Sequence, residues 1–144
     1  MEAEKQNYGM PEGSIGPAPG PQAMSEGEER TWSALAHLSV FANLFTGFLG
    51  PVVALVIWLV YKDRSERVAF QALQSVWYQV AWLAILGAGW VVTGVLTIVL
   101  IGFLLIPVMA LVTLVPFVHG AYAAYKVNKY GEYRYPLIAD LISR

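Results

Sequence analysis

Two long stretches of the chain, residues 31–61 and 68–125, contain no Asp, Glu, Lys or Arg and consist mostly of apolar residues. A helix on the surface of a soluble protein normally keeps charged and polar residues on its outer face. One Asp, Lys or Arg at the centre of a membrane helix costs about 2.5–3.5 kcal/mol on insertion scales, so bilayer-crossing segments avoid charge. The pattern therefore predicts an all-α integral membrane protein.

Breaks in the apolar pattern divide it into four helices. Ser25 followed by Glu28 matches a capping box, which predicts a helix start near residue 26. Gly50-Pro51 interrupts the first stretch, because proline is tolerated in the first turn of a new helix but not inside an existing one. Ile101-Gly102 interrupts the second stretch in the same way. The predicted helices cover about 26–46, 51–62, 65–100 and 106–129.

The first two helices can form either one kinked span or a short hairpin. Residues 51–61 reach only about 17 Å at 1.5 Å per residue, against a hydrocarbon core of about 30 Å. In the hairpin, all 9 Lys and Arg residues lie on one side of the membrane, as the positive-inside rule favours. We therefore favour two helical hairpins, the first of them short. A shallow first hairpin that does not cross fully is also allowed if other helices cover its turn.

The residues outside the helices add constraints on class and location. Residues 1–24 are rich in Gly and Pro, which predicts a disordered tail before a membrane helical domain of residues 25–144. The first thirty residues are acidic and lack the apolar run of a signal peptide. The net charge of -1 argues against nucleic acid as a partner. We expect a multi-pass protein of the cell membrane with both termini in the cytoplasm.

Several short strings resemble a known family. The most specific are Ala36-His37-Leu38-Ser39 and Gly131-Glu132-Tyr133-Arg134-Tyr135-Pro136, with Lys62-Asp63-Arg64-Ser65 between them. They resemble bacterial Tic-twenty-like proteins, small four-helix membrane proteins named for a subunit of the chloroplast inner-envelope translocon. The resemblance covers about residues 28–140. It implies four membrane helices and no particular activity.

His37 is the sharpest candidate for chemistry, because it lies within an otherwise apolar helix and polar groups at membrane depth are often functional. Three interpretations compete: a hydrogen bond to a neighbouring helix, a proton or ion relay, and ligation of a haem or chlorin metal. His119 is the other histidine, and two imidazoles without a carboxylate or thiolate make a poor metal site. We therefore predict no metal and no cofactor, and a hydrogen-bonding role for both histidines.

A polar stripe marks the start of the third helix. Gln71, Gln74 and Tyr78 follow one another at helical spacing and so share a face. Three interpretations are open: the stripe lines a polar path, it forms hydrogen bonds across helices, or Gln71 and Gln74 face lipid headgroups on an amphipathic turn.

Basic residues gather at the predicted cytoplasmic ends of the helices, where each can attract anionic lipid by about 1 kcal/mol. The candidates are Lys62, Arg64, Arg67, Lys126, Lys129 and Arg134. Ordinary determinants of topology have the same pattern. Tyr125, Tyr130, Tyr133 and Tyr135 are expected to form an aromatic cluster at the membrane interface.

Catalysis is not expected, because the apolar stretches lack Asp, Glu and Cys, and an enzyme needs a nucleophile or an acid and base within reach of each other. The chain has 0 Cys residues, which excludes disulfides and thiol chemistry. Two functions remain. The first is an accessory module that packs against the bilayer and against other membrane proteins or itself. The second is a channel or translocation component whose path is lined by the Gln-rich stripe and His37.

Overall fold

The computed structural model describes residues 23–143, and this part of the chain is helical without any strand. The all-α class is therefore confirmed for the described residues, whereas the predicted disordered tail lies almost entirely outside them. The elements in chain order are α1 Glu26–Leu38, the 3-10 helix η1 Ser39–Ala42, α2 Asn43–Thr46, α3 Leu49–Tyr61, α4 Glu66–Thr97, α5 Gly102–Tyr130 and α6 Ile138–Ile142.

The start of α1 is the predicted capping box. The backbone N–H of Glu28 donates to Ser25 Oγ at 3.3 Å, and the backbone N–H of Ser25 donates to Glu28 Oε2 at 2.9 Å. The helix predicted for 26–46 is not continuous, because α1 ends at Leu38 and η1 and α2 follow as separate turns. Gly47 then adopts a left-handed φ of +83°, which ends α2 and reverses the chain.

The later helices differ from the predicted boundaries at their ends. α3 begins at Leu49 rather than residue 51, so that Pro51 lies within its first turn. α5 begins at Gly102 rather than residue 106 and continues through Pro107 and Pro116 to Tyr130. Gly102 packs so closely on the end of α4 that an added Cβ would overlap the backbone nitrogen of Thr97.

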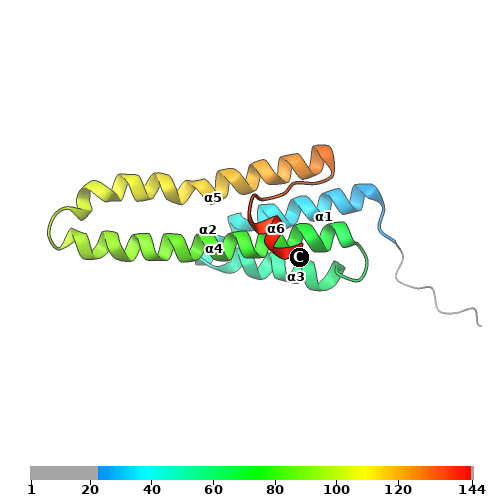
Figure 1. Cartoon of the computed structure of the whole chain (residues 1–144), viewed down its shortest axis with the longest axis horizontal. Helices are drawn as coiled ribbons and strands as arrows, with labels where there is room; N and C mark the ends of the chain where they lie inside the picture. Colours follow the sequence, from blue (N-terminus) through cyan, green and yellow to red (C-terminus); the bar gives the residue numbers. More distant parts are fainter. Residues whose placement is uncertain (1–22, 144) are drawn as a thin grey trace, which may run out of the picture.

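The helices form a long hairpin and a short one (Figure 1). α4 and α5 run side by side along their length, and α1 and α3 cover only the half of this pair that contains the start of α4 and the end of α5. The start of α1, the loop between α3 and α4 and the end of α5 all lie at the same end of the molecule. The charged residues around these three points are therefore gathered at one end, whereas α6, which contains Asp140, lies further along the bundle.

Within residues 23–143, two helices are long and apolar enough to cross a membrane, namely α4 with 32 residues and α5 with 29 residues. At 1.5 Å per residue they reach about 48 and 43 Å, which exceeds the hydrocarbon core of about 30 Å. α3 reaches only about 20 Å. The half of the long hairpin beyond α1 and α3 exposes large apolar side chains, with Ile98 82% and Leu104 76% exposed. These side chains match a lipid environment.

Candidate functional site

A polar centre lies where α1, α4, α5 and the C-terminal segment meet. Its members are His37, Gln71, Gln74, Tyr78, His119, Tyr133 and Tyr135. The structure thus brings together all five polar residues singled out in the sequence and adds two tyrosines. Gln71 and Gln74 are buried in the bundle, so they do not face lipid headgroups.

His37 is held by hydrogen bonds at both ring nitrogens. Its Nδ1 lies 3.2 Å from the Tyr135 hydroxyl, and its Nε2 lies 2.9 Å from Gln71 Oε1. Burial raises the pKa of the Tyr135 phenol above its ordinary value, so the hydroxyl keeps its proton and can donate. Because Gln71 Oε1 can only accept, His37 Nε2 carries the proton and Nδ1 accepts from Tyr135. His37 is therefore a neutral, fully paired imidazole.

Gln74 attaches the C-terminal segment to the bundle. Its Nε2 donates to Gln71 Oε1 at 2.6 Å and also to the backbone carbonyl of Tyr133. Its Oε1 accepts from the backbone N–H of Tyr135 at 3.2 Å. Backbone groups outside a helix lack intrahelical partners, and the buried Gln74 amide pairs two such groups of the C-terminal segment.

The second half of the centre is built on His119. Tyr78 Oη lies 2.8 Å from His119 Nδ1, and Tyr133 Oη lies 2.7 Å from His119 Nε2. The ring of Tyr135 stacks on Tyr78 with centroids 4.0 Å apart and planes 6° from parallel. It also makes edge contacts with both imidazoles, at 5.2 Å from His37 and 5.0 Å from His119. Tyr135 therefore fills the space between the two histidines.

One helical turn further along α4, a second polar layer joins α4 to η1. The hydroxyls of Ser39 and Ser75 both donate to the backbone carbonyl of Ala36, at 2.7 and 2.6 Å. Gln79 Nε2 donates to both hydroxyl oxygens, at 2.8 and 3.0 Å. Gln79 Oε1 has no hydrogen-bond partner although the side chain is buried.

The basic candidates lie against aromatic rings at the charged end of the molecule. Lys62 lies 5.3 Å from the ring centre of Trp58, and Arg64 lies 5.6 Å from that of Tyr61. Lys126 and Lys129 share Tyr130, at 4.8 and 5.2 Å.

The two remaining basic candidates have acidic partners. Arg67 pairs with Glu29 at 3.3 Å, whereas Arg134 pairs with Asp140 at 3.7 Å and lies over Phe70. The basic residues therefore contact separate aromatic rings and acidic side chains, and they do not converge on one anion-binding pocket.

The histidines of the polar centre have no ring nitrogen free for chemistry, because all of these atoms contact other protein groups. Both nitrogens of each histidine contact protein groups, so none of the four is directed at a free site. Within residues 23–143, no group of three or more His, Cys, Asp and Glu side chains converges in a way that could hold a metal ion. The arrangement is suited to holding helices and the C-terminal segment together.

Sequence reasoning placed Tyr133 and Tyr135 at the membrane interface, and this was wrong for Tyr135, which is buried in the bundle. The chain turns back after Gly131, whose φ of +89° ends α5, and the next residues run beside α4. The one available signal was the short interval between Gly131 and Pro136, which forbids a continued helix.

The comparisons with known proteins identify a family. A model described as the magnetosome magnetite crystal formation protein family, MamF/MmsF, matches residues 28–142. The chain belongs to this family. The assignment replaces the predicted Tic-twenty-like family, whose resemblance rested on short strings and on generic apolar sequence between them.

The two other comparisons found no relatives of this chain. No curated protein and no solved structure matches the chain. The family match and the two long apolar helices together indicate a magnetosome-associated membrane protein.

Proposed function

We propose that this protein is a non-catalytic accessory protein of the magnetosome membrane that supports crystal formation through contacts with lipid and with neighbouring membrane proteins. The family match indicates the process, which is magnetite crystal formation. The observation that carries the accessory role is the polar centre. Every histidine nitrogen in it, and both Nε2 and Oε1 of the Gln74 amide, form hydrogen bonds within the chain. A conducting path needs polar groups that remain free for water or ions.

The arrangement in the membrane follows from the two hairpins. α4 and α5 cross the bilayer, and α1 and α3 enter beside them from the same side. The described Lys and Arg residues then face the cytoplasm, as the positive-inside rule favours. The far half of the α4–α5 pair exposes apolar side chains. It also contains Gly94, where an added Cβ would meet nothing within 4 Å. This half is the surface proposed for partner contacts, since small residues allow close helix approach.

Reconstituted vesicles distinguish the accessory role from conduction. The purified protein in sealed vesicles is expected to carry iron(II) and protons no faster than empty vesicles do. A flux that exceeds this background and disappears in the Gln71→Leu, Gln74→Leu double variant would establish the channel function instead.

A test in cells addresses crystal formation itself. Cells that form magnetosomes but lack this protein are supplied with the wild type, with Gly94→Leu, or with the control Gly27→Ala, which lies on the exposed charged end. We expect Gly94→Leu to change crystal size at unchanged protein abundance and Gly27→Ala to match the wild type. If cells with Gly94→Leu formed crystals of wild-type size, this result would contradict the proposed contact surface.

A further inference from the structure

A groove of about 590 Å³ lies between α1 and α3 of the short hairpin. Apart from Ser39, the residues that line it are apolar. Trp32, Leu35 and Leu38 belong to the α1 wall, and Val52, Val53 and Val56 belong to the α3 wall. Leu35, Val52 and Val56 are exposed, so the groove is open to molecules around the protein. Its volume lies within the range of about 300–1,000 Å³ that is usual for small-molecule sites.

The groove runs from the charged end of the molecule toward the turn of the short hairpin. At the charged end, the ring of Trp32 contacts that of Tyr61, with centroids 4.7 Å apart. At the other end, Leu49 is the first residue of α3. Residues 49–57 of the α3 wall span about 12 Å at 1.5 Å per residue, and one leaflet of the hydrocarbon core is about 15 Å thick. The groove therefore matches most of the length of an acyl chain in one leaflet.

Arg64 provides a cation at the charged end of the groove. Its guanidinium carbon lies 5.6 Å from the ring centre of Tyr61, the ring that contacts Trp32. The Arg64 side chain is exposed, and within residues 23–143 it belongs to none of the ion pairs with an N–O distance of up to 4.0 Å. A guanidinium group binds phosphate oxygens through strong, often bidentate hydrogen bonds. Arg64 is therefore available to a lipid phosphate.

Glu28 provides an anion beside it. Glu28, Trp32 and Leu35 follow one another at i, i+4 and i+7, so the carboxylate continues the groove face of α1 toward the charged end. Hydrogen bonds from Ser25 lower the pKa of Glu28, and the nearby charge of Arg64 lowers it further. The Glu28 side chain is exposed and does not form an ion pair with Arg64 within residues 23–143. The groove thus ends at two opposite charges that lie near each other without pairing.

We infer that the groove binds a phospholipid with a primary-amine headgroup, such as phosphatidylethanolamine. One acyl chain lies between α1 and α3, the phosphate lies at Arg64 and the ammonium lies at Glu28. A primary ammonium has three N–H donors for a carboxylate, as a lysine does. The quaternary nitrogen of choline has no N–H donor, and a glycerol headgroup has no cation. This inference rests on the proposed membrane location and adds the class of lipid that the short hairpin selects.

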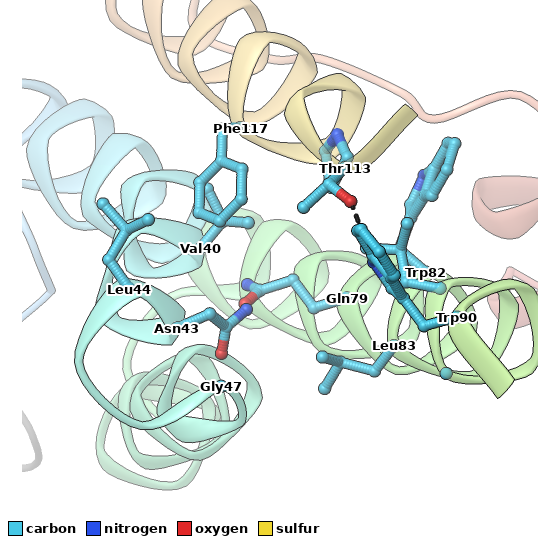
Figure 2. A pocket seen from close by; sticks show the side chains of 13 residues that line it. Val40, Asn43, Leu44, Gly47, Gln79, Trp82, Leu83, Trp90, Thr113 and Phe117 are labelled. Carbon is cyan, nitrogen blue, oxygen red and sulfur yellow. Dashed lines mark hydrogen bonds between the residues drawn. The ribbon is translucent and has the colours of Figure 1, made fainter. Parts of the chain in front are cut away.

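A second crevice, of about 480 Å³, provides a comparison within the same molecule (Figure 2). It opens between the turn of the short hairpin and the helices α4 and α5. None of the residues that line it is charged. The indole N–H of Trp90 donates to Thr113 Oγ1 at 3.2 Å, as the dashed line in Figure 2 shows. We therefore expect lipid that contacts Trp90 to show no preference for a headgroup.

Bromine quenching of single tryptophans tests the inference. One variant keeps only Trp32, which lines the groove, and another keeps only Trp90, which lines the second crevice; the other tryptophans are replaced with Phe. Phosphatidylcholine vesicles contain increasing fractions of an acyl-brominated phospholipid with an ethanolamine, choline or glycerol headgroup. At Trp32, we expect the ethanolamine lipid to have a relative binding constant about threefold above the other two, which exposed ion pairs can supply. At Trp90, the three constants should be equal.

Two pairs of variants complete the test. Glu28→Gln keeps the capping-box pattern but removes the charge, so the preference for the ethanolamine lipid should disappear. Glu26→Gln is its matched control, because it removes the same charge from the same turn, away from the groove face, and should keep the preference. Val56→Phe fills the groove and should reduce Trp32 quenching by all three lipids. Val92→Phe, at a residue of similar exposure on α4, should leave this quenching unchanged.

The outcomes separate the lipid preference from the membrane location. Equal constants for the three lipids at Trp32, or a preference that persists in Glu28→Gln, would overturn the inference and leave the membrane location intact. If no brominated lipid quenched Trp32 or Trp90, the membrane location and the inference would both be refuted. Should a single-tryptophan variant lose its helical circular dichroism, the difference in quenching between the wild type and Trp32→Phe gives the same measurement on the native chain.

Discussion

Removing one hydroxyl group should loosen the C-terminal segment by a measurable amount. Tyr135→Phe keeps the ring that stacks on Tyr78 at 4.0 Å but removes the O–H that donates to His37 Nδ1 at 3.2 Å. The imidazole nitrogen is then buried without a donor, which costs about 1–3 kcal/mol. We therefore expect the free energy of unfolding to fall by about 1–3 kcal/mol, against about 3–5 kcal/mol for Tyr135→Ala, which also loses the ring.

The assay is equilibrium unfolding in mixed detergent micelles, followed by far-UV circular dichroism as the denaturing detergent increases. Tyr130→Phe is the matched control, because Tyr130 is exposed and its ring contacts with lysine are kept. This control should change the unfolding free energy by less than about 0.5 kcal/mol. A double-mutant cycle with His37→Leu should give a coupling of at least about 0.5 kcal/mol between residues in contact.

The reasoning about the polar centre would be refuted by a specific pair of results. If Tyr135→Phe were no more destabilising than Tyr130→Phe and the cycle with His37→Leu showed no coupling, the C-terminal segment would not be docked on α1. The tautomer gives an independent check. Nitrogen NMR should show the His37 proton on Nε2, as the bond to Gln71 Oε1 requires.

Two further predictions concern the helix ends. Gly50→Ala should destabilise the protein by about 1–3 kcal/mol in the same unfolding assay, because the added Cβ would overlap the Gln79 Oε1 position and crowd the Ser39 carbonyl at 2.8 Å. Gly27→Ala, with open space around it, should not destabilise, and equal effects of the two would argue against the close packing of α3 on η1. Hydrogen bonds from Ser25 lower the pKa of Glu28 below 4.5, so the capping box should stabilise α1 above that pH and lose this contribution as the pH falls through the lower folded value. A carboxylate titration by NMR that gives Glu28 an unshifted pKa in the wild type, or the same pKa in Ser25→Ala, would contradict this.

Much of the fold follows from local sequence. The capping box of Ser25 and Glu28, the stop at Gly47 and the placement of Pro51 in a first turn all depend on residues within a few positions of each other. The gathering of charge at one end also follows, since hairpins alternate direction and the charged segments occupy every second connection.

The parts that were not predicted depend on contacts between distant residues. Tyr135 reads as an interfacial tyrosine from its neighbours, and only the return of the chain beside α4 brings it to His37, 98 positions away. Gln79 continues the polar face of α4, but its unpaired oxygen arises from the positions of two serine hydroxyls on different elements. The family predicted from the sequence was also wrong, because that prediction depended on short strings shared with another family. The family match over residues 28–142 corrects it.

Membrane topology is the most direct test of the whole account. The chain has 0 Cys residues, so Asp63→Cys, Glu132→Cys and Val99→Cys each introduce one thiol, at the α3–α4 loop, after α5 and at the far end of the long hairpin. In sealed vesicles of one orientation, a membrane-impermeant maleimide should label residues 63 and 132 from one side and residue 99 only from the other. Labelling of 63 and 132 from opposite sides, or of all three from the same side, would contradict the two-hairpin membrane fold.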